Sequence, residues 1–214
     1  MSRRLFIGTS GYQYDHWRGV LYPDGLPQEE WFRRYTGSFG AVEINNTFYN
    51  LPEPGTFDRW RDQAPPGFRF AVKFSRYGTH MKKLKDPGEP LRRFLARVRR
   101  LKSRLGPVLV QLPPHWGADP GRLDAFLDAA PGDVDWAVEF RDPDWLRHAV
   151  YQVLRDHGAA LVIHDRLADH PLHVTADLVY LRYHGQEYRT GYSPQYLSGQ
   201  ARRIRRFLDQ GLQV

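Results

Sequence analysis

The sequence has no cysteine and only two methionines. Without cysteine there are no disulfide bonds, no thiol nucleophile and no cysteine-bound zinc or iron–sulfur cluster. No apolar run approaches the ~20 residues that span a bilayer. The apolar stretch after Arg4 reaches Gly8 at once, whereas a secretory signal needs roughly 7–15 apolar residues and a cleavage site. We therefore expect a soluble, cytoplasmic protein with no membrane partner.

What is present is an ordinary globular composition with excess positive charge. The 214 residues, 41% of them hydrophobic, predict one domain over residues 1–214, with a core large enough to be stable without disulfides or structural metals. The net charge of +7 favours a nucleic-acid partner. A solvated surface is the alternative, because many arginines lie in one amphipathic stretch, Leu91 to Leu105, which we expect Gly106-Pro107 to end. Both interpretations stay open.

Short apolar runs alternate with helical patterns seven times along the chain. The runs are nearly continuous, as in parallel strands covered on both faces. This alternation predicts an α/β fold with a parallel sheet, either open or closed into a barrel. No glycine-rich dinucleotide fingerprint follows the first strand, and polar residues end nearly every strand, which favours a TIM-like (β/α) barrel. The expected strands cover residues 5–7, 41–45, 70–74, 108–112, 136–140, 161–163 and 178–183.

The predicted barrel is one strand short, because a closed TIM-like barrel has eight. After the last predicted helix the sequence offers only Gly211-Leu212-Gln213-Val214. We therefore expect seven strands, with the barrel open or with its eighth strand and helix missing or truncated.

Polar side chains gather near the carboxyl ends of the predicted strands. Residues two apart on a strand share a face. If the apolar neighbours face the helices, the polar ones face the barrel axis, where a buried charge must be paired or functional. An ion-pair lattice that merely plugs the barrel is the structural alternative. The pairs are Glu43 with Asn45, Lys73 with Ser75, Glu139 with Arg141 and Arg182 with His184; Gln111 and Asp165 join them.

The mixed charge of this set suits a small anionic polar ligand, phosphorylated or carboxylated, or acid–base chemistry. A divalent-metal site is richer in carboxylates and histidines and lacks close cations, so a metal is open but not favoured and no residue is assigned to one. We assign catalysis to Glu43 and Glu139, as acid–base groups, and to Lys73, which with the arginines also holds the anion. The assigned ligand-binding residues are Tyr12, Asn45, Tyr49, His80, Gln111, Arg141, Asp165, Arg182 and His184.

Two features of the loops each have two interpretations. Loop aromatics such as Tyr12 and Tyr49 either stack on a sugar or base at the mouth of the pocket or pack under their own loops. The basic loop from His80 to Lys85 either grips phosphates or forms a solvated lid.

Six blocks of sequence follow one another over nearly the whole chain. They are Ile7-Gly8-Thr9-Ser10-Gly11-Tyr12 with Trp17 and Tyr22-Pro23, Val42-Glu43-Ile44-Asn45-Asn46-Thr47-Phe48-Tyr49, Phe70-Ala71-Val72-Lys73, Val110-Gln111-Leu112-Pro113-Pro114, Val138-Glu139-Phe140-Arg141 with Trp145, and Leu181-Arg182-Tyr183-His184-Gly185. In this order they resemble the YecE-like family of unknown function, found in bacteria and archaea. The resemblance implies a TIM-like barrel, no particular reaction, and a final strand with an asparagine pair and a closing helix beyond Val214.

Three classes of function follow from these observations. The first is an enzyme for a small anionic ligand at the mouth of the barrel. The second is a nucleic-acid-binding barrel of the phosphodiesterase or repair type, based on the net charge, the lysine loop, the aromatics and a fold analogy. The third is a protein that binds a ligand without turnover.

Overall fold

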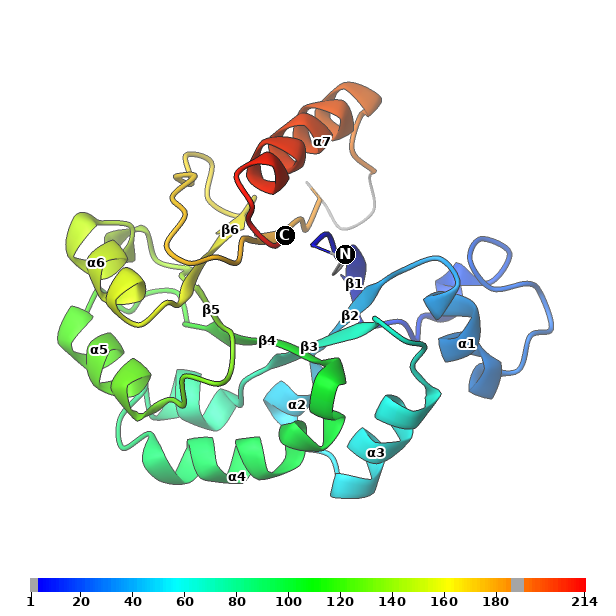
Figure 1. Ribbon diagram of the computed structural model, residues 1–214, viewed down its shortest axis with the longest axis horizontal. Coiled ribbons are helices and arrows are strands. Elements are labelled where there is room, and N and C mark those ends of the chain that lie inside the picture. Colours follow the sequence, from blue (N-terminus) through cyan, green and yellow to red (C-terminus); the bar gives the residue numbers. More distant parts are fainter. Residues whose placement is uncertain (1–3, 186–190) are drawn as a thin grey trace.

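Seven parallel strands form one sheet that curls around the middle of the molecule. The computed structural model describes residues 4–185 and 191–214, and its strands are hydrogen-bonded in sequence order from β1 to β7. Figure 1 shows the sheet as an arc with helices along its outer side. The predicted TIM-like α/β fold is confirmed. The strands are β1 (Gly8–Ser10), β2 (Ala41–Ile44), β3 (Arg69–Lys73), β4 (Leu105–Gln111), β5 (Trp136–Glu139), β6 (Ala160–His164) and β7 (Tyr180–Arg182).

Helices connect the strands and cover the convex side of the sheet (Figure 1). α5 begins with a capping residue and a proline: Asp119 accepts a hydrogen bond from the backbone N–H of Arg122 at 3.0 Å, and Pro120 occupies the first helical position. The helices are α1 (Trp31–Thr36), α2 (Asn46–Tyr49), α3 (Pro54–Gln63), α4 (Gly88–Val98), α5 (Pro120–Ala129), α6 (His148–Asp156) and α7 (Pro194–Asp209). Shorter turns are η1 (Asp15–Trp17), η2 (Gln28–Glu30), the π-helix η3 (Tyr77–Met81), η4 (Arg99–Arg104) and η5 (Pro143–Trp145).

The helix expected to reach Leu105 is shorter than predicted. α4 ends at Val98, η4 follows, and β4 already begins at Leu105. Gly106-Pro107 therefore lies inside a strand rather than after a helix. Proline cannot donate to a sheet ladder, and the β3–β4 register shifts at this point: Phe70 pairs with Leu105, but Val72 pairs with Val108. The strand accommodates its proline by a local irregularity.

The barrel is open between its first and last strands, since no ladder joins β1 to β7 in the described part of the chain. Gln213 and Val214 lie between the segments that lead into these two strands. Gln213 forms a parallel bridge with Leu178, and the backbone of Val214 exchanges hydrogen bonds with Arg4 and Phe6 at 2.7 and 2.8 Å. The two residues thus connect the segments before β7 and β1 by strand-like hydrogen bonds.

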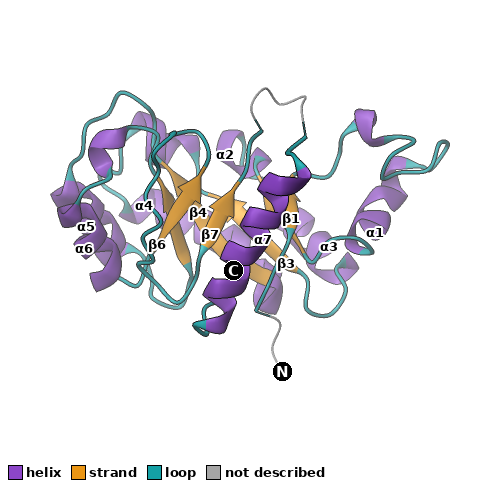
Figure 2. Ribbon diagram, turned by 90° about the horizontal axis from the view of Figure 1, so that it is seen from above, coloured by secondary structure: helices purple, strands orange, loops and turns teal. Residues whose placement is uncertain are grey.

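Inward and outward side chains form two separate apolar layers. The larger layer lies between the sheet and the helices and includes Trp31, Phe70, Phe94 and Trp145. A small inner layer lines the barrel and is described below. α7 lies over the opening of the barrel (Figure 2), where Phe207 packs with Ile163 and Val179. Within the described residues, no helix combines the length and apolarity needed to cross a membrane.

Candidate functional site

Inside the barrel, a floor of small apolar side chains carries a layer of polar ones. The buried floor consists of Leu109, Ala137, Ala160 and Val162. Because inward-facing residues are two apart on a strand, the next inward residue on each strand is polar and sits at its carboxyl end. Gln111 follows Leu109, Glu139 follows Ala137, His164 follows Val162 and Arg182 follows Tyr180; Glu43 and Lys73 come from β2 and β3.

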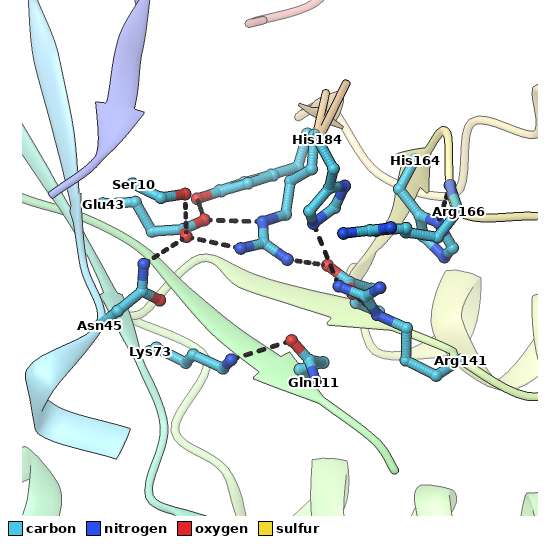
Figure 3. Close-up of polar contacts among 12 residues, drawn as sticks. Ser10, Glu43, Asn45, Lys73, Gln111, Arg141, His164, Arg166 and His184 are labelled. Atoms are coloured by element: carbon cyan, nitrogen blue, oxygen red, sulfur yellow. Dashed lines mark hydrogen bonds and ion pairs between the residues drawn. The ribbon is translucent and has the colours of Figure 1, made fainter. Parts of the chain in front are cut away.

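Glu43 is bound from several strands at once. Its Oε1 accepts hydrogen bonds from Ser10 Oγ at 2.7 Å, Asn45 Nδ2 at 3.0 Å and Arg182 Nη2 at 2.7 Å. Its Oε2 accepts from Tyr180 OH at 2.7 Å and Arg182 Nε at 2.9 Å (Figure 3). Burial alone would raise the pKa of Glu43, but the charge and hydrogen bonds of Arg182 outweigh it and lower the pKa. Glu43 is therefore an ionised carboxylate whose lone pairs are fully used.

Glu139 shares the same arginine and is completely buried. Arg182 Nη1 donates to its Oε2 at 2.5 Å, and Arg141 Nε contacts its Oε1. Burial would raise the pKa of Glu139, yet the charges of Arg182 and Arg141 lower it. Arg182 thus links two buried carboxylates from β2 and β5, in the paired arrangement that a buried charge requires.

A second network continues from Arg141 to the loop after β7. Arg141 Nη2 donates to His184 Nε2 at 3.1 Å, so the ring proton of His184 is on Nδ1, which donates to Asp165 Oδ1 at 2.9 Å. Burial lowers the pKa of His184 and outweighs the bond to Asp165. Asp165 also accepts from the Tyr192 hydroxyl and from the backbone N–H of His184; burial raises its pKa, but these bonds lower it to about 2. This network of hydrogen bonds therefore joins a neutral histidine to an ionised carboxylate.

Lys73 differs from the other charges of this layer. Its Nζ donates to the neutral Oε1 of Gln111 at 2.9 Å and lies 4.2 Å from the centre of the Phe48 ring. Among the described residues it forms no ion pair. Figure 3 shows Lys73 and Gln111 side by side below the carboxylate network. Burial and the charge of Arg182 lower the pKa of Lys73 to about 8, although Glu43 and Glu139 partly oppose the shift.

His80 lies next to Lys73. Together with Gln111 and Phe48, these two residues form one corner of the polar layer. Its ring meets the Phe48 ring edge-to-face at 4.9 Å. The Thr79 hydroxyl donates to the Ser75 carbonyl at 2.9 Å, so it accepts from His80 Nδ1 at 2.9 Å, which leaves Nε2 without a proton. Burial and the charges of Lys73 and Arg76 lower the pKa of His80 to about 4. His80 is therefore neutral at physiological pH.

A cavity of about 450 Å³ opens along the gap between β1 and β7. Its polar end is lined by Ser10, Glu43, Arg182 and His184, and its apolar end by residues such as Ala71 and Leu178. The cavity reaches one side of the carboxylate network, and Lys73 lies outside it.

Two of the predicted ligand-binding residues lie away from this layer. Tyr12 is buried in the outer core, with its ring 5.2 Å from Phe32 and 5.7 Å from Tyr35. We predicted Tyr12 as a ligand-binding residue, but the structure places it outside the polar layer: it follows β1, and its side chain points toward the helices. Tyr49 is 80% exposed on the short α2, where its ring contacts that of its neighbour Phe48. The other predicted residues lie in the networks described above, with Lys73, Gln111 and His80 beside the ion-paired ones.

Several members of the cluster were missed by the sequence analysis. Tyr180 binds Glu43 and is two residues before Arg182, so the same period-two rule would have found it. His164 donates its Nε2–H to the Phe140 carbonyl at 2.8 Å, while its Nδ1 accepts from the backbone of Arg166. Tyr192 comes from a loop and Phe48 from the short helix α2, where the period-two rule does not apply. Within residues 4–185 and 191–214, no group of three potential ligands could hold a metal ion.

Together the curled parallel sheet and the charged layer at its carboxyl end define an α/β barrel protein with a polar interior. Residues 6–214 match the model of DUF72, a protein family of unknown function. The chain belongs to the DUF72 family, which confirms the YecE-like resemblance.

Two curated relatives come from bacteria. The UPF0759 protein YecE of Escherichia coli K12 is 37% identical over 144 residues, which cover 66% of this chain and 50% of that protein. The UPF0759 protein YunF of Bacillus subtilis is 24% identical over 157 residues, covering 69% and 54%. The chain thus spans about half the length of the curated relatives it matches.

Solved structures of the family share the fold. A DUF72 family protein from Thermotoga maritima superposes with a TM-score of 0.82 at 28% identity, covering 96% of this chain and 89% of that one. Another, from Enterococcus faecalis, gives a TM-score of 0.75 at 18% identity, covering 97% and 87%; the latter likeness concerns the fold alone.

Proposed function

We propose that this barrel binds a small anionic polar ligand, carboxylated or phosphorylated, at the carboxyl end of its strands, with Lys73 and Arg141 as the cations that hold the anion. The observation that carries the proposal is the half-buried ammonium group of Lys73, which has a neutral amide and an aromatic ring as neighbours and no carboxylate partner among the described residues. A cation withdrawn from water without a counter-ion is costly, and an anionic ligand removes that cost.

Arg141 supplies the second cation in this proposal. Its Nε contacts Glu139 and its Nη2 binds His184, so within the described residues Nη1 is left for a ligand. A planar guanidinium suits carboxylate and phosphate oxygens. Glu43 and Glu139 are ionised and have no proton to give, so their part in this proposal is to fix Arg182 and Arg141. An acid–base role would need a bound ligand to weaken those pairs.

The test is calorimetric titration of the protein with lactate, glycerol 3-phosphate and inorganic phosphate. We expect at least one probe to bind, and Lys73→Met to weaken it about tenfold or more, the cost of losing one charge-assisted contact. The matched control is Lys85→Met, an exposed lysine of the loop that follows β3. Absence of binding by all three probes, or equal losses in the two variants, would contradict the proposal.

A nucleic-acid ligand is the second candidate, and one surface feature favours it. Tyr49 and Tyr77 are 80% and 48% exposed, and both line a groove of about 320 Å³ together with Arg76 and Arg93. Exposed aromatic faces stack on bases, at roughly 1–3 kcal/mol per base, and arginines contact phosphates.

This candidate is tested by fluorescence anisotropy with a single-stranded oligonucleotide over a series of salt concentrations. Binding that weakens steeply with salt, and that falls about tenfold in the Tyr77→Ala variant, would support it. No binding at low salt would reject it and leave the small-ligand proposal untouched.

A further inference from the structure

Lys73 has the surroundings of a reactive amine rather than of a structural cation. A structural lysine of the same loop region, Lys82, pairs with Asp86 at 3.1 Å. Lys73 instead meets an amide oxygen and the face of Phe48, and the ring of Phe48 in turn contacts the neutral ring of His80. Only one of the three ammonium hydrogens has an acceptor among the described residues. A side chain held in this way is positioned without being neutralised.

We propose that Lys73 forms an imine with a carbonyl compound that also carries a carboxylate or phosphate group. The inference rests on the proposed function, because the site must first hold the anion. Arg141 then binds the anionic group and the carbonyl carbon lies against Nζ. The substrate class is thereby narrowed to 2-oxo acids and phosphorylated aldehydes or ketones.

The step balances without any further reactant. The uncharged amine attacks the carbonyl carbon and a C–N bond forms. The carbonyl oxygen then leaves as water with the two hydrogens of the amine, and the C=N bond remains. Lysines used in this way have a lowered pKa because they are desolvated or close to another cation.

The surroundings of Lys73 favour the uncharged amine. Burial is the main cause that lowers its pKa; Arg182 and Arg141 lower it further, while Glu43 and Glu139 raise it, for a net value of about 8. His80, on the loop after β3, is neutral. At pH 7 roughly a tenth of Lys73 is therefore uncharged, against well under a thousandth of an ordinary lysine. The amine is available near neutral pH.

The loop after β3 keeps this corner in one arrangement. The π-helix η3 (Tyr77–Met81) carries His80, and π-helical turns occur often at functional sites. Lys83 and Leu84 follow with φ of 48° and 64°, in a region that non-glycine residues rarely adopt. The Leu84 side chain is nevertheless buried, which anchors the strained backbone.

The experiment is borohydride trapping with pyruvate and with dihydroxyacetone phosphate, followed by peptide mass spectrometry. Reduction of an imine adds the mass of the probe less one oxygen atom. The chain contains only five lysines, Lys73, Lys82, Lys83, Lys85 and Lys102, so each site is read separately. We expect the Lys73 adduct to exceed that at each other lysine at least tenfold at pH 7, and to increase with pH through about 8.

Lactate and glycerol 3-phosphate, which carry a hydroxyl in place of the carbonyl, separate this inference from the proposed function. Lys73→Arg keeps the charge and should bind these two compounds within a few-fold of wild type while giving no adduct; Lys85→Arg should label like wild type at Lys73. If the hydroxyl compounds bind but Lys73 gives no adduct, or all lysines react equally, the imine is refuted and the binding proposal stands. If nothing binds and nothing is trapped, both are refuted.

Discussion

The polar layer of this barrel contains two neighbouring regions built on opposite principles. Around Arg182, Glu43 and Glu139 each have paired oxygens, and the guanidinium divides its hydrogen bonds between them. Around Lys73, on a neighbouring part of the same sheet, the partners are an amide and an aromatic ring, and that ring contacts a neutral histidine. The first region uses its charges to hold three strands together. The second leaves a charge available.

This difference shows that a buried charge does not by itself mark a functional group. Buried ion pairs break even against apolar packing, yet they become very costly when one partner is removed. A buried cation without a counter-ion is costly from the start and persists for another reason. The Arg182 network therefore predicts large effects on stability, and Lys73 predicts effects on binding and reactivity.

The largest expected effect comes from Arg182→Met. The substitution leaves Glu43 and Glu139 buried and unpaired, which should lower the free energy of unfolding by roughly 3–5 kcal/mol. Urea denaturation followed by circular dichroism measures it. The matched variant Lys73→Met removes a cation with no counter-ion, so it should leave the free energy of unfolding at neutral pH unchanged or higher. Equal losses in the two variants would erase the distinction between the regions.

The second-largest effect should be a loss of stability at low pH, which arises in the Arg182 region. Glu43, Glu139 and Asp165 all have a pKa below the ordinary value in the folded protein. A lowered carboxyl pKa adds stability that is complete above the unfolded pKa of about 4 and is lost as the pH falls toward the folded one. Between about pH 5 and pH 2 we expect a loss on the order of 1–3 kcal/mol. A urea midpoint that stays constant over this range would contradict the network of ionised carboxylates.

Lys73 should show the opposite signature in alkali. Its folded pKa of about 8 lies below the ordinary 10.5, so between these values the unfolded chain binds more protons than the folded one and stability rises with pH. In the middle of this pH range, Lys73 should raise the free energy of unfolding by roughly 1.4 kcal/mol per pH unit. Between pH 8 and 10 we expect the free energy of unfolding of the wild-type protein to rise relative to that of Lys73→Met, as measured by urea titrations. Parallel curves would show that Lys73 is an ordinary lysine.

The sequence was sufficient for the fold and for most of the inner polar layer. Period-two alternation identified Glu43, Lys73, Glu139 and Arg182, because strand geometry fixes which side chains point inward. The rule failed where no strand sets direction. Tyr12 comes just after β1, and only the packing of its ring against Phe32 and Tyr35 on the helical side decides that it is a core residue.

Hydrogen-bond partners were harder to predict than positions. Nothing in the residue types separates Lys73 from Arg182, since both lie on the barrel axis near the same carboxylates. The difference arises from reach: the longer guanidinium bridges Glu43 and Glu139, and Lys73 meets Gln111 on the adjacent strand. The extent of α4 was misjudged for a related reason, because the Gly106-Pro107 pair that commonly ends a helix is here absorbed into β4.

The smallest effect should come from Tyr49→Ala, and it sharpens the limits of the site. Tyr49 is 80% exposed, so its removal should change the free energy of unfolding by less than about 0.5 kcal/mol. If the ligand site is confined to the corner around Lys73 and Arg141, the affinity for lactate or glycerol 3-phosphate should also stay within twofold of wild type. A clear loss of affinity in calorimetric titration would place Tyr49 at the ligand after all. The exposed face of α2 would then belong to the same site as the barrel interior.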